Sequence, residues 1–152
     1  MLRKIKKFSQ LSTHERNLFM EAYYTLGMMR AAILRVPFKR LVRSLEHQSK
    51  KDEFTELSEE KKKMALSIGK AIEQAAVHTP WESACLAQSL TAQKMLKKRG
   101  IPGAFYLGVS KDKNAEEKMK AHAWSQCAEV IITGGRGHED FTVLSVFGWG
   151  EK

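Results

Sequence analysis

Gly100 divides the sequence into two parts with different hydrophobic patterns, and this division constrains the fold more than any other feature. Before it, apolar residues recur at helical spacing; after it, short strand-like runs occupy residues 104–110, 121–127, 129–133 and 141–149. Short strands joined by short turns favour an antiparallel sheet, and helices followed by strands favour the α+β class. The chain of 152 residues is long enough to bury a substantial core.

The first helix is predicted between residues 13 and 37. Ser12 and Glu15 have the spacing of a capping box, and Pro37 ends the apolar pattern. Residues 39–47 have the pattern of a shorter helix, and the polar residues 48–57 that of a connection. From their helical spacing, five residues of the first helix are expected in the core: Leu18, Met20, Tyr24, Met28 and Ile33.

Two more helices are predicted before the strands. Ser58 begins one of them, with acidic residues in its first turn, and it ends before Pro80. Residues 79–82, "TPWE", form a second capping box with proline at the first helical position. The helix that follows has a basic last turn and Gly100 as its left-handed stop.

The net charge of +9 is concentrated near the N-terminus, where residues 1–50 hold eleven Lys and Arg against three Glu. Such a segment suits nucleic acid, an acidic peptide or protein partner, or a plain solvated face. The sequence has neither a run long enough to span a membrane nor the pattern of a signal peptide. A cytoplasmic location and reduced cysteines are therefore expected.

Cys85 lies near the start of the third predicted helix, where the helix N-terminus stabilises a thiolate. A nucleophilic thiol needs a histidine within reach, and His122 is the best placed by pattern, at the start of a strand with Trp124 on its own face. The residues alone leave open a packed thiol and an ordinary strand histidine. The two cysteines and the histidines lack paired metal-ligand spacing, so no zinc site is expected, and Cys127 is expected to be a small packed residue.

Four short motifs favour a catalytic pair over a packed thiol and an ordinary strand histidine, because they occur together and in order. They are "CL" at 85–86, "LKKRGI" at 96–101, "LGV" at 107–109 and "AHAW" at 121–124. This set resembles the leader peptidases of lasso-peptide biosynthesis, members of the transglutaminase-like, papain-related superfamily. The resemblance implies a basic helical region at residues 1–54 and, at 55–152, a papain- or transglutaminase-like core whose nucleophile helix packs on an antiparallel sheet.

The resemblance also implies a reaction. Such enzymes cut a ribosomally made precursor between its leader and core peptides, so Cys85 would attack the scissile carbonyl and His122 would protonate the leaving amine. A separate leader-binding protein would present the precursor, and an ATP-dependent lasso cyclase would use the freed amine. Neither a metal nor an organic cofactor is implied, and neither a membrane nor a nucleic-acid partner is expected.

The third member of the triad departs from the pattern of many relatives, which have an aspartate on the strand after the histidine strand. A hairpin around Ala128 puts Gly134 opposite His122, where no carboxylate is available. Asp140 and Glu129 are the carboxylate candidates. A backbone carbonyl, the Thr133 hydroxyl or a two-residue site are the alternatives.

Two other functions compete with the peptidase. One is a basic adaptor that binds nucleic acid or an acidic protein and leaves Cys85 inert, which predicts strongly salt-dependent binding. The other is an acyltransferase on the same fold, which would form an amide with an added amine instead of hydrolysing the acyl group.

Overall fold

Helices come first along the described part of the chain and most of the strands follow. The computed structural model describes residues 12–37, 40, 46–48, 57–79, 85–111, 119–128, 130–135 and 141–149. Within these residues the helices are α2 (Thr13–Arg35), α4 (Glu59–His78) and α5 (Cys85–Lys98). The strands are β1 (Glu46–Gln48), β2 (Gly103–Lys111), β3 (Met119–Cys127), β4 (Val130–Thr133) and β5 (Thr142–Trp149).

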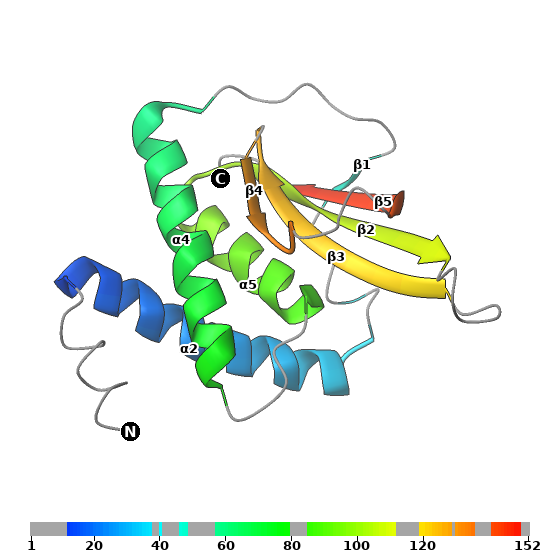
Figure 1. Ribbon diagram of the computed structural model, residues 1–152, viewed down its shortest axis with the longest axis horizontal. Helices are drawn as coiled ribbons and strands as arrows, with labels where there is room; N and C mark the ends of the chain where they lie inside the picture. The colour runs from blue at the N-terminus through cyan, green and yellow to red at the C-terminus, as the bar shows by residue number, and fades with distance from the viewer. Residues whose placement is uncertain are drawn as a thin grey trace.

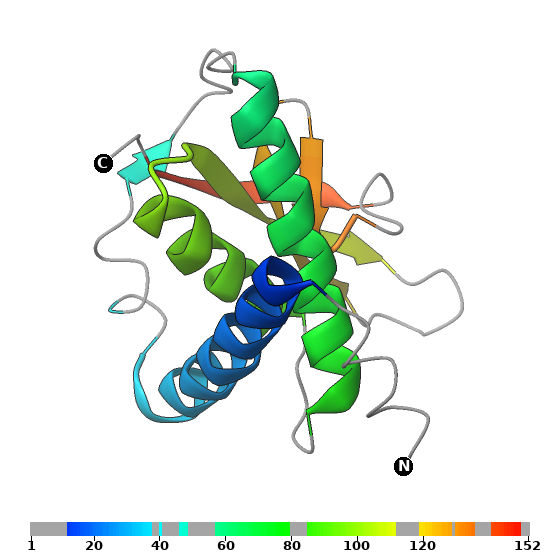
Figure 2. The same ribbon diagram turned by 90° about the vertical axis from the view of Figure 1, so that its left-hand side faces the viewer.

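The described strands form one antiparallel sheet in the order β1-β5-β2-β3-β4. The helices lie to one side of it, as Figure 2 shows. The central helix is α5, because it packs on β2, β3 and β4 and also on α2 and α4 (Figure 1). The fold is α+β, as the helix-then-strand pattern predicts.

The hydrophobic core joins all three described helices to the sheet. Leu26 of α2, Ile72 of α4, Leu96 of α5 and Phe105 of β2 are each fully buried and belong to one cluster. The helix α2 therefore packs into the same core as the sheet. The predicted boundary between residues 54 and 55 lies outside the described residues and stays a prediction.

Helix ends follow the predicted signals where the structure describes them. Ser12 and Glu15 form a complete capping box at α2, and the Ser58 hydroxyl accepts the Lys61 backbone N–H at α4. At the end of α5, Gly100 is left-handed (φ 69°). The backbone N–H of Ile101 donates to the carbonyl of Leu96, which closes the helix with a Schellman motif.

Two predictions about the N-terminal part are wrong. Residues 46–48 form β1, which pairs with β5, whereas the pattern placed residues 46 and 47 in a short helix and residue 48 in a connection. Met20, Tyr24 and Met28 are 40%, 66% and 50% exposed, although their helical spacing predicted a core position. The reason is that α2 carries apolar residues around much of its circumference, and packing on α4 and α5 selects the side that contains Leu18 and Leu26.

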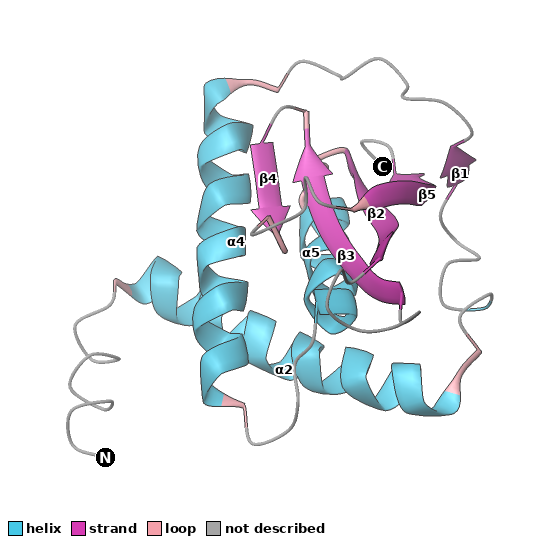
Figure 3. Cartoon of the chain, turned by 45° about the vertical axis from the view of Figure 1, so that its right-hand side comes forward, coloured by secondary structure: helices cyan, strands magenta, loops and turns pink. Residues whose placement is uncertain are grey.

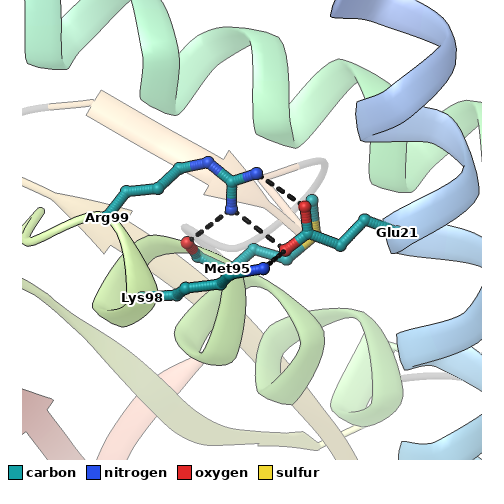
Figure 4. A network of polar contacts seen from close by, with 4 residues as sticks. All are labelled: Glu21, Met95, Lys98 and Arg99. Carbon is teal, nitrogen blue, oxygen red and sulfur yellow. Dashed lines mark hydrogen bonds and ion pairs between the residues drawn. The ribbon is translucent and has the colours of Figure 1, made fainter.

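A polar cluster ties the C-terminal end of α5 to α2 (Figure 4). The two terminal guanidinium nitrogens of Arg99, Nη1 and Nη2, donate to the two carboxylate oxygens of Glu21 at 3.0 and 2.6 Å, and Nη1 also donates to the carbonyl of Met95. Lys98 adds an ion pair with Glu21 at 3.6 Å. The hydrogen bond from Arg99, with the nearby positive charges, holds the pKa of Glu21 below its usual range.

At the edge of the sheet formed by β4, α4 lies along that strand, as Figure 3 shows. Gly69 allows this close approach, because a Cβ there would lie 2.6 Å from the backbone carbonyl oxygen of Ile132. The strand β4 therefore has β3 as its partner in the sheet and α4 packed beside it. None of the described helices is long and apolar enough to cross a membrane.

Candidate active site

Cys85 is the first described residue of α5, and it is half-buried. Of the capping box predicted at residues 79–82, residues 80–82 lie outside the described residues. Its first member, Thr79, caps the end of α4 and donates its hydroxyl to the carbonyl of Ala76. The structure therefore places the thiol at the described beginning of the helix that packs most centrally on the sheet.

His122 lies on β3 and is half-buried between aromatic rings. Its ring centroid is 5.8 Å from that of Trp124 and 5.0 Å from that of Phe141. Trp124, which is 3% exposed, also stacks on Tyr106 with an interplanar angle of 6°. These rings fix the plane of the imidazole. Gly108, directly opposite His122 on β2, leaves room for them, because a Cβ there would crowd Phe141 and Trp124.

A short hydrogen bond fixes the orientation of the imidazole within that plane. The Nε2 atom of His122 lies 2.6 Å from the carbonyl oxygen of Gly134. A carbonyl oxygen can only accept, so Nε2 carries the proton and donates it. In the neutral ring Nδ1 is then the unprotonated nitrogen, with its lone pair available as a base.

The hairpin between β3 and β4 turns at Ala128, which has a left-handed backbone (φ 50°). The turn lies where the sequence predicts it, but the pairing of β3 with β4 differs from the predicted register. An irregularity between Ser125 and Gln126 pairs Thr133 with Ser125. Counting equal distances from Ala128 along both strands would pair Ser125 with residue 131, so the observed register differs from that count by two residues. The predicted neighbourhood of Gly134 and His122 is nevertheless present, because the hydrogen bond joins the side chain of one to the backbone of the other.

The opposite face of β3 carries a chain of buried hydroxyl groups. The Thr133 hydroxyl lies 2.6 Å from that of Ser125 on β3 and 3.5 Å from that of Ser89 on α5. Ser89, Ser125 and Thr133 are at most 4% exposed. These contacts thus hold Thr133, the last residue of β4, against both β3 and α5, immediately before Gly134.

The comparison with protein families decides the wider assignment. The model of the transglutaminase-like superfamily matches residues 32–146, a range that includes all of α4, α5 and β1 to β4 and most of β5. The chain belongs to the transglutaminase-like superfamily. That superfamily includes cysteine peptidases and acyltransferases. No curated protein and no solved structure matches the chain.

In this transglutaminase-like chain the predicted site residues are only partly brought together. Helix α5 packs on β3, but within the described residues the hydrogen bond of His122 goes to Gly134 and none joins it to Cys85. The carboxylate candidates Asp140 and Glu129 lie outside the described residues. The buried chain of hydroxyl groups through Ser125 and Ser89 was not predicted. The usable signal was alternation, which puts Ser125 on the buried face of β3.

The second cysteine has the opposite environment to a reactive thiol. Cys127 is fully buried in the core, and burial raises the pKa of its thiol to about 12. It is therefore the small packed residue that the sequence indicated. Among the described residues, no group of three or more histidine, cysteine and acidic side chains is arranged to hold a metal ion.

Proposed function

We propose that this transglutaminase-like chain is a cysteine peptidase that removes the leader from a lasso-peptide precursor, with Cys85 as nucleophile and His122 as acid and base. The observation that carries the proposal is the fixed imidazole. Its Nε2 is held by a carbonyl, and its Nδ1 is left as the basic nitrogen. The ordered sequence motifs, from "CL" at 85–86 to "AHAW" at 121–124, supply the more specific assignment to lasso precursors.

The reaction follows from these roles. Nδ1 of His122 removes the proton from the Cys85 thiol, and the thiolate adds to the scissile carbonyl carbon to form a tetrahedral intermediate. The intermediate collapses, the C–N bond breaks, and Nδ1–H protonates the leaving amine of the core peptide. Water, deprotonated by the same nitrogen, then hydrolyses the thioester and releases the leader. This sequence requires Sγ and Nδ1 to meet. In the structure α5, which begins with Cys85, packs on the face of β3 that carries Ser125, whereas His122 lies on the other face. The proposal therefore requires a rearrangement, on substrate binding, that brings the two side chains together.

The partners remain those that the resemblance implies. A leader-binding protein would present the precursor, and an ATP-dependent cyclase would take the freed core. The basic region at residues 1–50 is the natural surface for one of these partners or for an acidic leader. Reversing the charge of Lys39, Arg40 and Arg43 together should then weaken cleavage at physiological salt. Unchanged cleavage and binding would remove that role from the region.

The first test is the pH dependence of Cys85 alkylation by iodoacetamide. Coupling to His122 predicts a rate that rises at a pH below that of a free thiol, about 8.5, and His122→Ala should move the profile upward. His14→Ala is the matched control, because His14 lies exposed in the first turn of α2. A profile that is the same in all three proteins would make Cys85 an inert thiol and favour the basic adaptor.

The second test is cleavage of a lasso precursor peptide in the presence of its leader-binding protein, followed by mass spectrometry. Cys85→Ala should abolish product, and His122→Ala should slow its formation by about 10²–10⁴-fold. Adding an amine such as methylamine separates hydrolysis from acyl transfer, the second candidate that the superfamily supports. A leader that carries a new amide at its C-terminus would identify an acyltransferase. A precursor that stays intact with the wild-type chain would contradict both.

A further inference from the structure

The acceptor for Nε2 of His122 is a backbone group, although cysteine peptidases commonly use a side chain for this purpose. The bond is short at 2.6 Å, and its acceptor cannot rotate away as a side chain can. Because the acceptor is neutral, it fixes which nitrogen carries the proton without adding a negative charge beside the ring. The carbonyl of Gly134 therefore sets the tautomer and the orientation of the His122 ring.

The backbone around Gly134 explains why a side chain is absent at this position. Gly134 is left-handed (φ 70°), a conformation that side chains rarely tolerate. A Cβ there would collide with the carbonyl oxygen of Ala123 and lie 3.1 Å from both Cα and Cβ of Trp124. An aspartate cannot occupy this position without moving β3 or β4. The glycine and the short hydrogen bond are thus two parts of one arrangement.

The residue before Gly134 is fastened on the other face of the sheet. The Thr133 hydroxyl lies between those of Ser125 and Ser89, and all three are buried. Since Thr133 and Gly134 share a peptide bond, holding the Thr133 side chain restricts where the next carbonyl can point. The hydroxyl groups have no contact with the imidazole in the structure, so any influence on it passes through the backbone.

We propose that the backbone carbonyl of Gly134 orients His122 in place of a triad side chain, and that Thr133 is the positioning residue that keeps this carbonyl in register with Nε2. The proposal rests on the proposed function only for its catalytic meaning. The tautomer of the neutral imidazole, with the proton on Nε2, is a property of the folded chain and can be measured without substrate.

The experiment is two-dimensional proton–nitrogen NMR of histidine-labelled protein at a pH where the imidazoles are neutral. His122→Gln identifies the resonances of His122 by their loss. The wild-type chain should show the proton on Nε2, with slow exchange against solvent. Thr133→Val removes the hydroxyl with little change of shape, and it should give a mixture of tautomers and at least about tenfold faster exchange of the Nε2 proton. Thr133→Ser should restore the wild-type signals.

Two glycine variants test the carbonyl itself. Gly134→Ala should shift the proton from Nε2 or mix the tautomers, because its Cβ displaces the backbone. Gly135→Ala is the comparison variant, because Gly135 is not left-handed and the atoms nearest to its added Cβ belong to the Ile131 side chain, with Cγ2 at 2.9 Å. That side chain must shift, but the carbonyl of Gly134 is not displaced directly, so the variant should keep the wild-type tautomer. Circular dichroism must show all variants folded. If Gly134→Ala does not fold, the Thr133 pair still decides the outcome.

The results separate this proposal from the proposed function. A wild-type proton on Nδ1, or Thr133→Val signals identical to wild type, would overturn the positioning role even if alkylation couples Cys85 to His122. Conversely, the predicted tautomers combined with an uncoupled Cys85 would leave the carbonyl contact intact and remove its catalytic meaning.

Discussion

The two faces of β3 have different side chains and serve different purposes. On the face toward α5 lie Ala123, Ser125 and Cys127, all small and at most 2% exposed. On the other face lie His122 and Trp124, in an aromatic cluster with Tyr106 and Phe141. Small side chains let the helix approach the strand closely, whereas large rings hold an imidazole in place. Alternation along one strand thus separates a face of small packed residues from a face that carries the candidate histidine.

The largest effect is expected in cysteine reactivity, which compares Cys127 on the α5 face of β3 with Cys85 at the described beginning of α5. With a pKa of about 12, the Cys127 thiol has about one thiolate in 10⁴ molecules at pH 8, and it is also inaccessible. In the folded chain, iodoacetamide should therefore label the half-buried Cys85 at least about 10³-fold faster than Cys127. Peptide mass mapping measures this ratio, and labelling in guanidinium should make the two equal. Equal rates in the folded chain would contradict the buried position of Cys127.

Removing the large ring should have the next largest effect. Trp124→Ala takes away a side chain that is 3% exposed and stacked on Tyr106, so the free energy of unfolding should fall by about 3–5 kcal/mol. Trp124→Phe keeps part of the stack and should lose less. Urea denaturation followed by circular dichroism measures both. A loss below about 1 kcal/mol for the alanine variant would mean that the cluster is not packed as described.

On the α5 face the expected effect is smaller and non-additive. Ser125→Ala leaves the buried Thr133 hydroxyl without its partner at 2.6 Å, which should cost about 1–2 kcal/mol of unfolding free energy. The double variant Ser125→Ala with Thr133→Val removes both hydroxyl groups, so it should be closer to wild type than the sum of the two single changes. Strict additivity in urea denaturation would show that the two hydroxyl groups do not interact.

The smallest effect is expected away from β3, at the ion pair between Arg99 and Glu21 that joins the end of α5 to α2. Arg99 lowers the pKa of Glu21, so the carboxylate stabilises the fold above the ordinary value of 4.5, and this contribution disappears as the pH falls through the lowered pKa. Glu21→Gln should cost about 1 kcal/mol at pH 7, because solvent screens the pair. The difference from wild type should shrink as the pH falls below 4.5 and vanish once the pH is below the lowered pKa of Glu21, whereas the exposed Glu73→Gln should match wild type throughout. A pH-independent difference would exclude the charge as its cause.

Local signals predicted most of the fold. Ser12 and Ser58 begin helices and Gly100 ends one, as their side chains or backbone conformation require, because a cap involves only residues three to five apart. Burial on α2 was less predictable. Tyr24 and Leu26 are both apolar and two positions apart, yet one is 66% exposed and the other fully buried. The choice depends on how α4 and α5 pack, which helical spacing does not contain.

The site was predictable as far as the residue types that chemistry requires. A cysteine at a helix start and a histidine on a strand are visible in the sequence, and so is the lack of a carboxylate at position 134. The irregularity after Ser125 was not, because it depends on how β4 fits against both β3 and α4. The acceptor of the histidine is a main-chain oxygen, which every residue possesses, so no residue type marks it.

The position of β4 has a consequence for how the proposed activity would be lost on heating. It comes last in the sheet order, spans four residues and pairs with one neighbouring strand. Short edge strands open locally at a lower free energy than the whole protein unfolds, and amide hydrogen exchange detects such opening. Each opening would detach Gly134 from the imidazole while the helices stay intact. Under the proposed function, thermal inactivation should therefore precede the loss of helical structure.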